Sequence, residues 1–171
     1  IIGHAGSGTH LIIDNRVHAF SNKNAISILK NSQINVYHDK IQKVIRIKKM
    51  SERYDHKIIG KIDLHLPFNT NLRGTIKNSD LTISKVRGTI AINTESTDSD
   101  LNNLNGNINI ITRGGNISAT KLSGEMELSV VSGDINIFDC DANSMLTMDN
   151  GNIFINGLKG NLLSNTTLGE T

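Results

Sequence analysis

The stretch from residue 106 to residue 137 reads GNINIITRGGNISATKLSGEMELSVVSGDINI, and it contains four segments of the form Gly-x-apolar-x-apolar. Each segment begins nine residues after the previous one. Alternate side chains of an extended chain point to the same face, so each segment predicts a short strand with one buried face. The glycine before each strand supplies the backbone freedom that a tight turn needs. Two strands and two turns therefore make one repeat, which spans two of these segments.

The same repeat continues on both sides of this stretch. Two interleaved glycine series have an 18-residue spacing and are offset by nine residues, and Ala142 is the one interruption of the first series. We predict that these glycines occupy structural turns: Gly88, Gly106, Gly115, Gly124, Gly133, Gly151, Gly160 and Gly169. Two positions before the first series lies an apolar ladder, predicted to line the core: Val86, Leu104, Leu122, Cys140 and Leu158.

One such coil cannot bury its own apolar face, but coils stacked at about 4.8 Å line up their isoleucines into a continuous core. The sequence therefore predicts an all-β fold, a β-helix-like β-solenoid with an 18-residue coil. We assign the regular β-solenoid to residues 61–171. Residues 1–60 predict irregular N-terminal β-strands, which either cap the solenoid or form imperfect coils.

The composition favours many short strands but does not identify a binding partner. The 171 residues carry a net charge of +2 and include one proline, one cysteine and no tryptophan. Residues 1–67 hold 11 Lys/Arg and 5 Asp/Glu (+6), whereas residues 68–171 hold 7 and 11 (−4). The basic half fits either an anionic partner or a solvated strand face, and the second interpretation is favoured. Cys140 has no disulfide partner within the chain and predicts a small buried hydrophobe.

Neither the hydropathy of the chain nor its two ends indicate the cellular compartment. No apolar run is long enough to span a bilayer, and no secretion signal is recognisable. The chain begins without methionine and stops within a repeat at Gly169, so we expect it to be a piece of a longer protein.

A family resemblance begins at residues 61–72, which read KIDLHLPFNTNL. An alternating strand that ends in Leu-Pro, a short polar turn and then stacked Gly-x-Ile-x-Ile units resemble bacterial adhesin domains of unknown function. Those domains are similar in style to the head domains of autotransporter adhesins. The resemblance implies a β-solenoid without known catalysis at the bacterial cell envelope or outside the cell. It carries over no catalytic residues.

The residues themselves predict no catalytic, cofactor-binding or metal site. The six histidines lack zinc-type spacing. Two groups of carboxylates, Glu95, Asp98 and Asp100 and then Asp139 and Asp141, could hold calcium or form a polysaccharide-cleaving acid pair. Because the repeat lacks a calcium signature, solvated turn carboxylates are the better interpretation.

Three functions stay open at this point. The leading one is a non-enzymatic adhesin or binding module, which presents a rigid β-solenoid surface to an unknown protein, glycan or lipid surface. The alternative is a self-assembling structural scaffold similar to bactofilins, with homo-oligomers formed through the solenoid ends. A polysaccharide-acting β-helix enzyme is the remote alternative. Nucleic acid is an unlikely partner, because stacking aromatics are absent near the basic run at residues 43–49.

Overall fold

A computed structural model describes residues 2–4, 10–17, 34–39, 44–49 and 58–168 of the protein, with side-chain surroundings from residue 65 onward. This part of the chain is built from β-strands, and it contains no helix long and apolar enough to cross a membrane. The chain divides into two compact units. One comprises Ile1–Leu11 and Asp63–Thr171, and the other comprises Ile12–Ile62.

The smaller unit contains an antiparallel strand pair. Strand β3 (Ile34–Asp39) runs beside β4 (Val44–Lys49), with Ile34 opposite Lys49 and Asp39 opposite Val44. Strand β2 (His10–Val17) lies mostly in this unit, and β5 (Ile58–Pro67) continues from it into the larger one. The antiparallel pairing of β3 and β4 differs from the parallel pairing that a solenoid coil requires.

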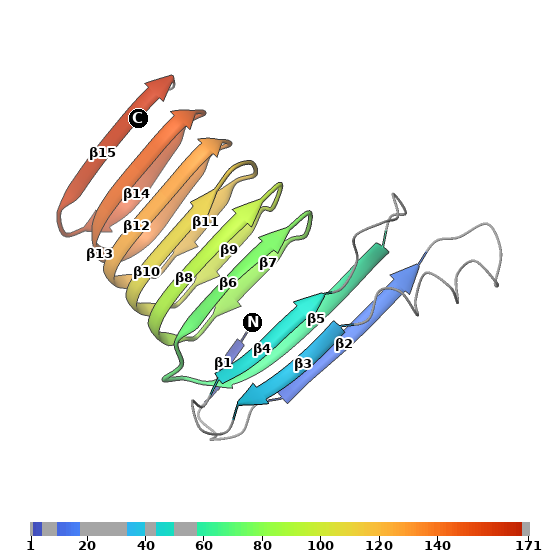
Figure 1. The fold of residues 1–171 in the computed structure, drawn as a ribbon. Coiled ribbons are helices and arrows are strands. Elements are labelled where there is room, and N and C mark those ends of the chain that lie inside the picture. The colour runs from blue at the N-terminus through green and yellow to red at the C-terminus, as the bar shows by residue number, and fades with distance from the viewer. Residues whose placement is uncertain (1, 5–9, 18–33, 40–43, 50–57, 169–171) are drawn as a thin grey trace. The chain divides into compact units, whose positions relative to one another are not determined.

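The larger unit is a solenoid whose coils stack side by side in Figure 1. Each coil gives one strand to each of two parallel sheets. The first sheet contains β6 (Leu72–Lys77), β8 (Arg87–Glu95), β10 (Asn105–Thr112), β12 (Ser123–Ser132), the second half of β13 (Ile135–Asn150) and β15 (Leu162–Leu168). The second sheet contains β7 (Leu81–Ser84), β9 (Ser99–Asn102), β11 (Ile117–Thr120), the first half of β13 and β14 (Ile153–Lys159).

Strand pairing between coils confirms the predicted repeat. Parallel neighbours in both sheets join residues 18 positions apart, as Gly88, Gly106 and Gly124 do in the first sheet. Ile117 lies beside Ile135 in the second sheet in the same way. The protein therefore forms an all-β solenoid of about five turns with an 18-residue coil.

The core lies between the two sheets. Inward residues of the first sheet, such as Ile90 and Ile110, meet those of the second sheet, such as Ile83 and Ile137, and all four are fully buried. At one corner the apolar ladder continues this core, with four residues buried and the last partly buried: Val86, Leu104, Leu122, Cys140 and Leu158. Burial of these aligned apolar side chains is the main source of stability, because an isolated coil would leave its apolar face exposed to water.

The turn glycines are required where successive coils approach each other. Gly133 has a φ of 140°, and a Cβ built there would collide with the carbonyl oxygen of Gly115 one coil earlier. Gly106 stands in the same relation to Gly88, at the other corner. A side chain at either position would push the coils apart, so the glycine series reflects close backbone stacking as well as turn conformation. The last glycine of the predicted series, Gly169, lies outside the described residues.

Ala142 marks a local change in the coil. It aligns with Gly124 of the preceding coil, but it has no positive φ. Strand β13 runs through this position for 16 residues and contributes to both sheets. The corner itself is retained, because Asp139 has a φ of 50°, as the equivalent Lys121 does in the preceding coil (55°), and the strand β13 continues through it.

Polar side chains hold the opposite corner together from coil to coil. Backbone N–H groups donate to a side-chain oxygen one coil earlier, from Asn116 to Asp98 Oδ1 at 2.7 Å, from Asp134 to Asn116 Oδ1 at 2.9 Å and from Asn152 to Asp134 Oδ1 at 2.9 Å. Side-chain oxygens of turn aspartates and asparagines thus satisfy backbone N–H groups of the next coil. They also fix the 18-residue register at each step.

The N-terminal end of the solenoid is partly covered. Strand β1 (Ile2–His4) runs parallel to β5, with Ile2 beside His65, and Ile2 also pairs with Ser84 of β7. In the first sheet, β6 is the outermost strand among the described residues. Its exposed residues include the cations Arg73 and Lys77.

A candidate binding groove on the first sheet

The outward face of the first sheet carries a polar row that runs along the solenoid axis. Because the strand period is two, residues between the buried isoleucines point to solvent. The stacking of successive coils then aligns one outward position of each coil: Thr89, Asn107, Glu125, Asn143 and Asn161. These five side chains are exposed. They extend over four coil intervals, or about 19 Å at the usual strand spacing.

A second row lies two residues further along each strand. It changes from polar to apolar along the axis, through Asn109, Glu127, Met145 and Leu163. Met145 is 42% exposed and Leu163 is 64% exposed, although both side chains are apolar. The row therefore offers hydrogen-bonding groups in the middle coils and an apolar contact surface near the last coil.

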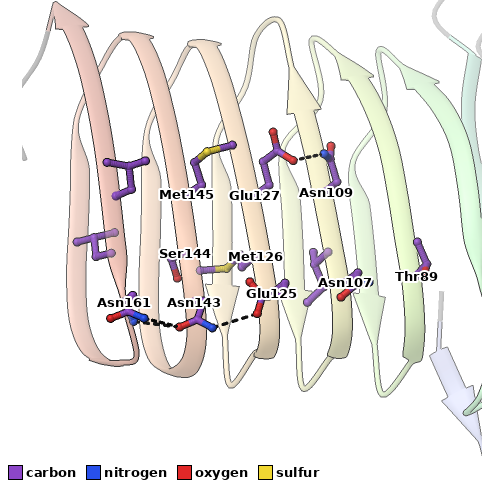
Figure 2. A pocket seen from close by; sticks show the side chains of 13 residues that line it. Thr89, Asn107, Asn109, Glu125, Met126, Glu127, Asn143, Ser144, Met145 and Asn161 are labelled. Atoms are coloured by element: carbon purple, nitrogen blue, oxygen red, sulfur yellow. Dashed lines mark hydrogen bonds between the residues drawn. The ribbon is translucent and has the colours of Figure 1, made fainter.

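Hydrogen bonds between coils orient the later part of the first row and the polar part of the second row (Figure 2). Asn143 donates through Nδ2 to Glu125 Oε1 at 3.0 Å, and Asn161 donates through Nδ2 to Asn143 Oδ1 at 3.2 Å. Asn109 donates through Nδ2 to Glu127 Oε2 at 2.5 Å. Each carboxylate keeps one oxygen outside these bonds, so the side chains are oriented while acceptors remain available to a ligand.

The two rows border a shallow, open groove of about 540 Å³, which we call the polar groove after its Asn and Glu side chains. Much of its exposed lining is nevertheless apolar, with Met145, Leu162 and Leu163. This volume is in the range of sites that bind small molecules or segments of a polymer. Its lining contains Glu125 and Glu127 and no lysine or arginine. Its electrostatics therefore disfavour phosphate, nucleic acid and other polyanions.

The aspartates singled out from the sequence do not share a site. Asp98 lies at the corner where side chains accept hydrogen bonds from the next coil, and it accepts one from the backbone N–H of Asn116. Asp139 occupies the turn at the other end of the second-sheet strands. Asp100 and Asp139 are offset by three residues along the strand and by two coils, or roughly 14 Å between Cα atoms from standard strand dimensions. Asp141 is exposed in β13 beside Ser123 and Lys159.

Glu95 forms an exposed ion pair with a residue of the preceding coil. Its Oε2 lies 2.5 Å from Lys77 Nζ. The hydrogen bond from Lys77, followed by the charge of that ammonium group, holds the pKa of Glu95 below its usual value. Among residues with described side chains, no group of three or more His, Cys, Asp and Glu residues could hold a metal ion. Of the six histidines, only His65 belongs to this part of the chain.

Cys140 is a buried member of the apolar ladder. Its thiol is 1% exposed and donates weakly to the carbonyl oxygen of Phe138 at 3.4 Å, while its sulfur accepts from the N–H of Leu122 at 3.4 Å. Burial raises the pKa of the Cys140 thiol above its usual value. The thiolate needed for nucleophilic attack is therefore scarce at neutral pH.

We expect Cys140 of the folded protein to react with iodoacetamide far more slowly than an unstructured thiol. Rising denaturant should increase the rate in step with unfolding, because only the opened chain exposes the sulfur. Mass spectrometry of the alkylated protein measures this rate. Rapid alkylation of the native protein at the rate of a free thiol would contradict the assigned burial.

The polar groove was not predicted from the sequence, although a usable signal was present. The outward positions of the alternating strands contain Asn, Thr and Glu, and the 18-residue spacing already places them in rows. Comparison of the chain with protein-family models, curated proteins and solved structures found no match.

Proposed function

We propose that the protein is a non-enzymatic binding module whose polar groove binds a neutral, hydroxyl-rich polymer such as a surface glycan. One observation carries the proposal: the groove is lined by rows of oriented amide and carboxylate groups that repeat once per coil. Amides both donate and accept, and carboxylates accept, which suits the hydroxyl groups of a sugar chain. A length of about 19 Å suits an extended ligand.

Charge and rigidity support the same assignment. The two carboxylates and the absence of cations in the lining argue against anionic glycans and anionic lipids at this groove. The cross-coil hydrogen bonds order the side chains before a ligand arrives, which reduces the entropy lost on binding. Adhesion to a cell or matrix surface is the role that such a groove would serve.

The test is a binding titration with a panel of neutral oligosaccharides and matched sulfated ones. We expect saturable binding of at least one neutral chain and none of the sulfated chains. Asn107→Ala and Glu127→Gln should each weaken binding by about tenfold, because each removes a hydrogen-bonding partner or its charge. Asn136→Ala, which changes an outward asparagine of the second sheet, serves as the control and should leave binding unchanged.

Two outcomes would contradict the proposal. One is the absence of binding across the whole neutral panel. The other is binding that the substitutions at Asn107 and Glu127 leave unaltered while Asn136→Ala reduces it, which would move the site to the other sheet.

Structural self-assembly is the second candidate function, because an unpaired strand edge can add a strand of another molecule and β6 has no further partner strand among the described residues. The dispersed positions of Asp100 and Asp139 give no comparable support to a polysaccharide-acting enzyme.

A further inference from the structure

The polar groove is long across the strands and narrow along them. Its first row crosses four successive strands of the first sheet from Thr89 to Asn143, and its second row lies two residues away along these strands. Four coils in register extend over about 14 Å, whereas two residues of a strand extend over about 7 Å. The side chains labelled in Figure 2 follow this longer direction. An extended polymer therefore fits the groove along the solenoid axis.

Three successive coils each present a pair of outward side chains to the groove, and we call each pair a subsite. The first subsite consists of two amides, Asn107 and Asn109, and the second consists of two carboxylates, Glu125 and Glu127. Adjacent subsites are about 4.8 Å apart, which is close to the length of one sugar unit in an extended β-linked chain. One coil can therefore contact one sugar unit.

The third subsite combines an amide with an apolar group, Asn143 with Met145. Met145 has a coil on each side, with Glu127 and Leu163 as its neighbours in the row, and it is still 42% exposed. Asn143 donates one hydrogen of Nδ2 to Glu125 Oε1, and the second hydrogen is outside this bond. A polarizable thioether beside an amide donor suits an acetamido substituent, which has a methyl group and a carbonyl acceptor.

We propose that the polar groove binds a neutral glycan with N-acetylated sugar units, which lies along the solenoid axis with one unit per coil. This inference rests on the proposed glycan-binding function and specifies its ligand. At the third subsite the acetyl methyl group packs on Met145, and the acetyl oxygen accepts a hydrogen bond from Asn143. The acetamido N–H and the hydroxyl groups of the neighbouring units bond to the carboxylates and amides of the other two subsites.

Calorimetric titration of the 171-residue chain with two matched series of β-1,4-linked oligosaccharides tests the inference. One series contains N-acetylglucosamine units and the other contains glucose units, so both are neutral and differ only in the acetamido group. We expect the acetylated tetramer to bind at least about tenfold more tightly than the glucose tetramer. The affinity of the acetylated series should rise from the dimer to the tetramer, because each added unit reaches a further coil.

Two substitutions locate the contacts along the groove. Met145→Ser should weaken binding of the acetylated tetramer by about tenfold and leave binding of the glucose tetramer unchanged. Ile111→Ser is the matched control, because Ile111 is an outward apolar residue of the same sheet with the same 42% exposure and lies outside the groove lining. It should leave both affinities unchanged. Asn107→Ala should weaken binding of the acetylated tetramer but not of the dimer, which occupies the second and third subsites.

The outcomes separate this inference from the proposed function. Equal affinity of the two tetramers, or an equal effect of Asn107→Ala on dimer and tetramer, would overturn the inference and leave glycan binding intact. Binding of a different neutral glycan, with no binding of the acetylated series, would overturn it in the same way. If no neutral glycan binds at all, the proposed function and this inference are both wrong.

Discussion

Replacement of Ile135 by aspartate is expected to abolish or nearly abolish the folded solenoid. Ile135 is fully buried in the second sheet, between Ile117 and Ile153 of the neighbouring coils. A carboxylate there has no partner, and the lost packing adds to the desolvation, so the free energy of unfolding should fall by more than about 4 kcal/mol. That loss is a large share of the total stability of a domain of this size.

The measurement is thermal or urea unfolding followed by far-ultraviolet circular dichroism. Ile111→Asp is the matched control, because Ile111 is an isoleucine on the outward face of β10 and is 42% exposed. This control should change the free energy of unfolding by less than about 0.5 kcal/mol. Equal effects of the two substitutions would mean that the assignment of inward and outward faces is wrong.

The second large effect is expected at a turn glycine. In Gly133→Ala the new methyl group would meet the carbonyl oxygen of Gly115, and the backbone would keep a φ of 140° that alanine strongly disfavours. Conformational strain and displacement of the stacked coils together should lower the free energy of unfolding by about 3 kcal/mol. Urea unfolding with a constant slope would measure this value.

Gly74 provides the control for this substitution. A Cβ at Gly74 has no atom within 4 Å, and its φ lies outside the positive region. Gly74→Ala should therefore be neutral or should stabilise the protein by up to about 1 kcal/mol, through the lower entropy of the unfolded chain. If Gly133→Ala were as harmless as Gly74→Ala, close coil stacking would not be the reason for the glycine series.

The repeat could be predicted from the sequence because a solenoid constrains the same position in every coil. Period-two alternation identified the inward residues, and the 18-residue spacing identified their neighbours in space. Ile108 and Met126, for example, are paired in the structure as that spacing requires. The residue pairs that contact each other between coils can therefore be identified from the 18-residue repeat of the sequence.

Features that break the periodicity were harder to predict. Ala142 was recognised as an interruption of the glycine series, but the backbone conformation that accommodates it between Gly124 and Gly160 depends on how the chain adapts between two fixed neighbours. The pairing of β1 with β5 and β7 was not predicted, because Ile2 and Ser84 are far apart in the sequence and share no repeat position.

The polar groove was missed for a different reason. Its residues are individually ordinary outward side chains, and only their alignment across coils creates a site. Glu125 and Asn143 become hydrogen-bonded partners because they occupy equivalent positions of adjacent coils. Residue spacing along the chain, which can indicate metal ligands or acid–base pairs, does not by itself indicate contacts between coils.

Deletion of one coil tests the in-register solenoid most directly. Removal of residues 106–123 deletes one whole coil and joins Asn105 to Gly124, which restores an Asn-Gly junction and keeps every later residue in its column. Removal of residues 106–122 deletes one residue fewer and shifts the later coils by one position, so that their inward and outward faces exchange. Calorimetry should show cooperative unfolding for the whole-coil deletion and no cooperative transition for the shorter deletion. Cooperative unfolding of both variants at the same temperature, or of neither, would contradict the account.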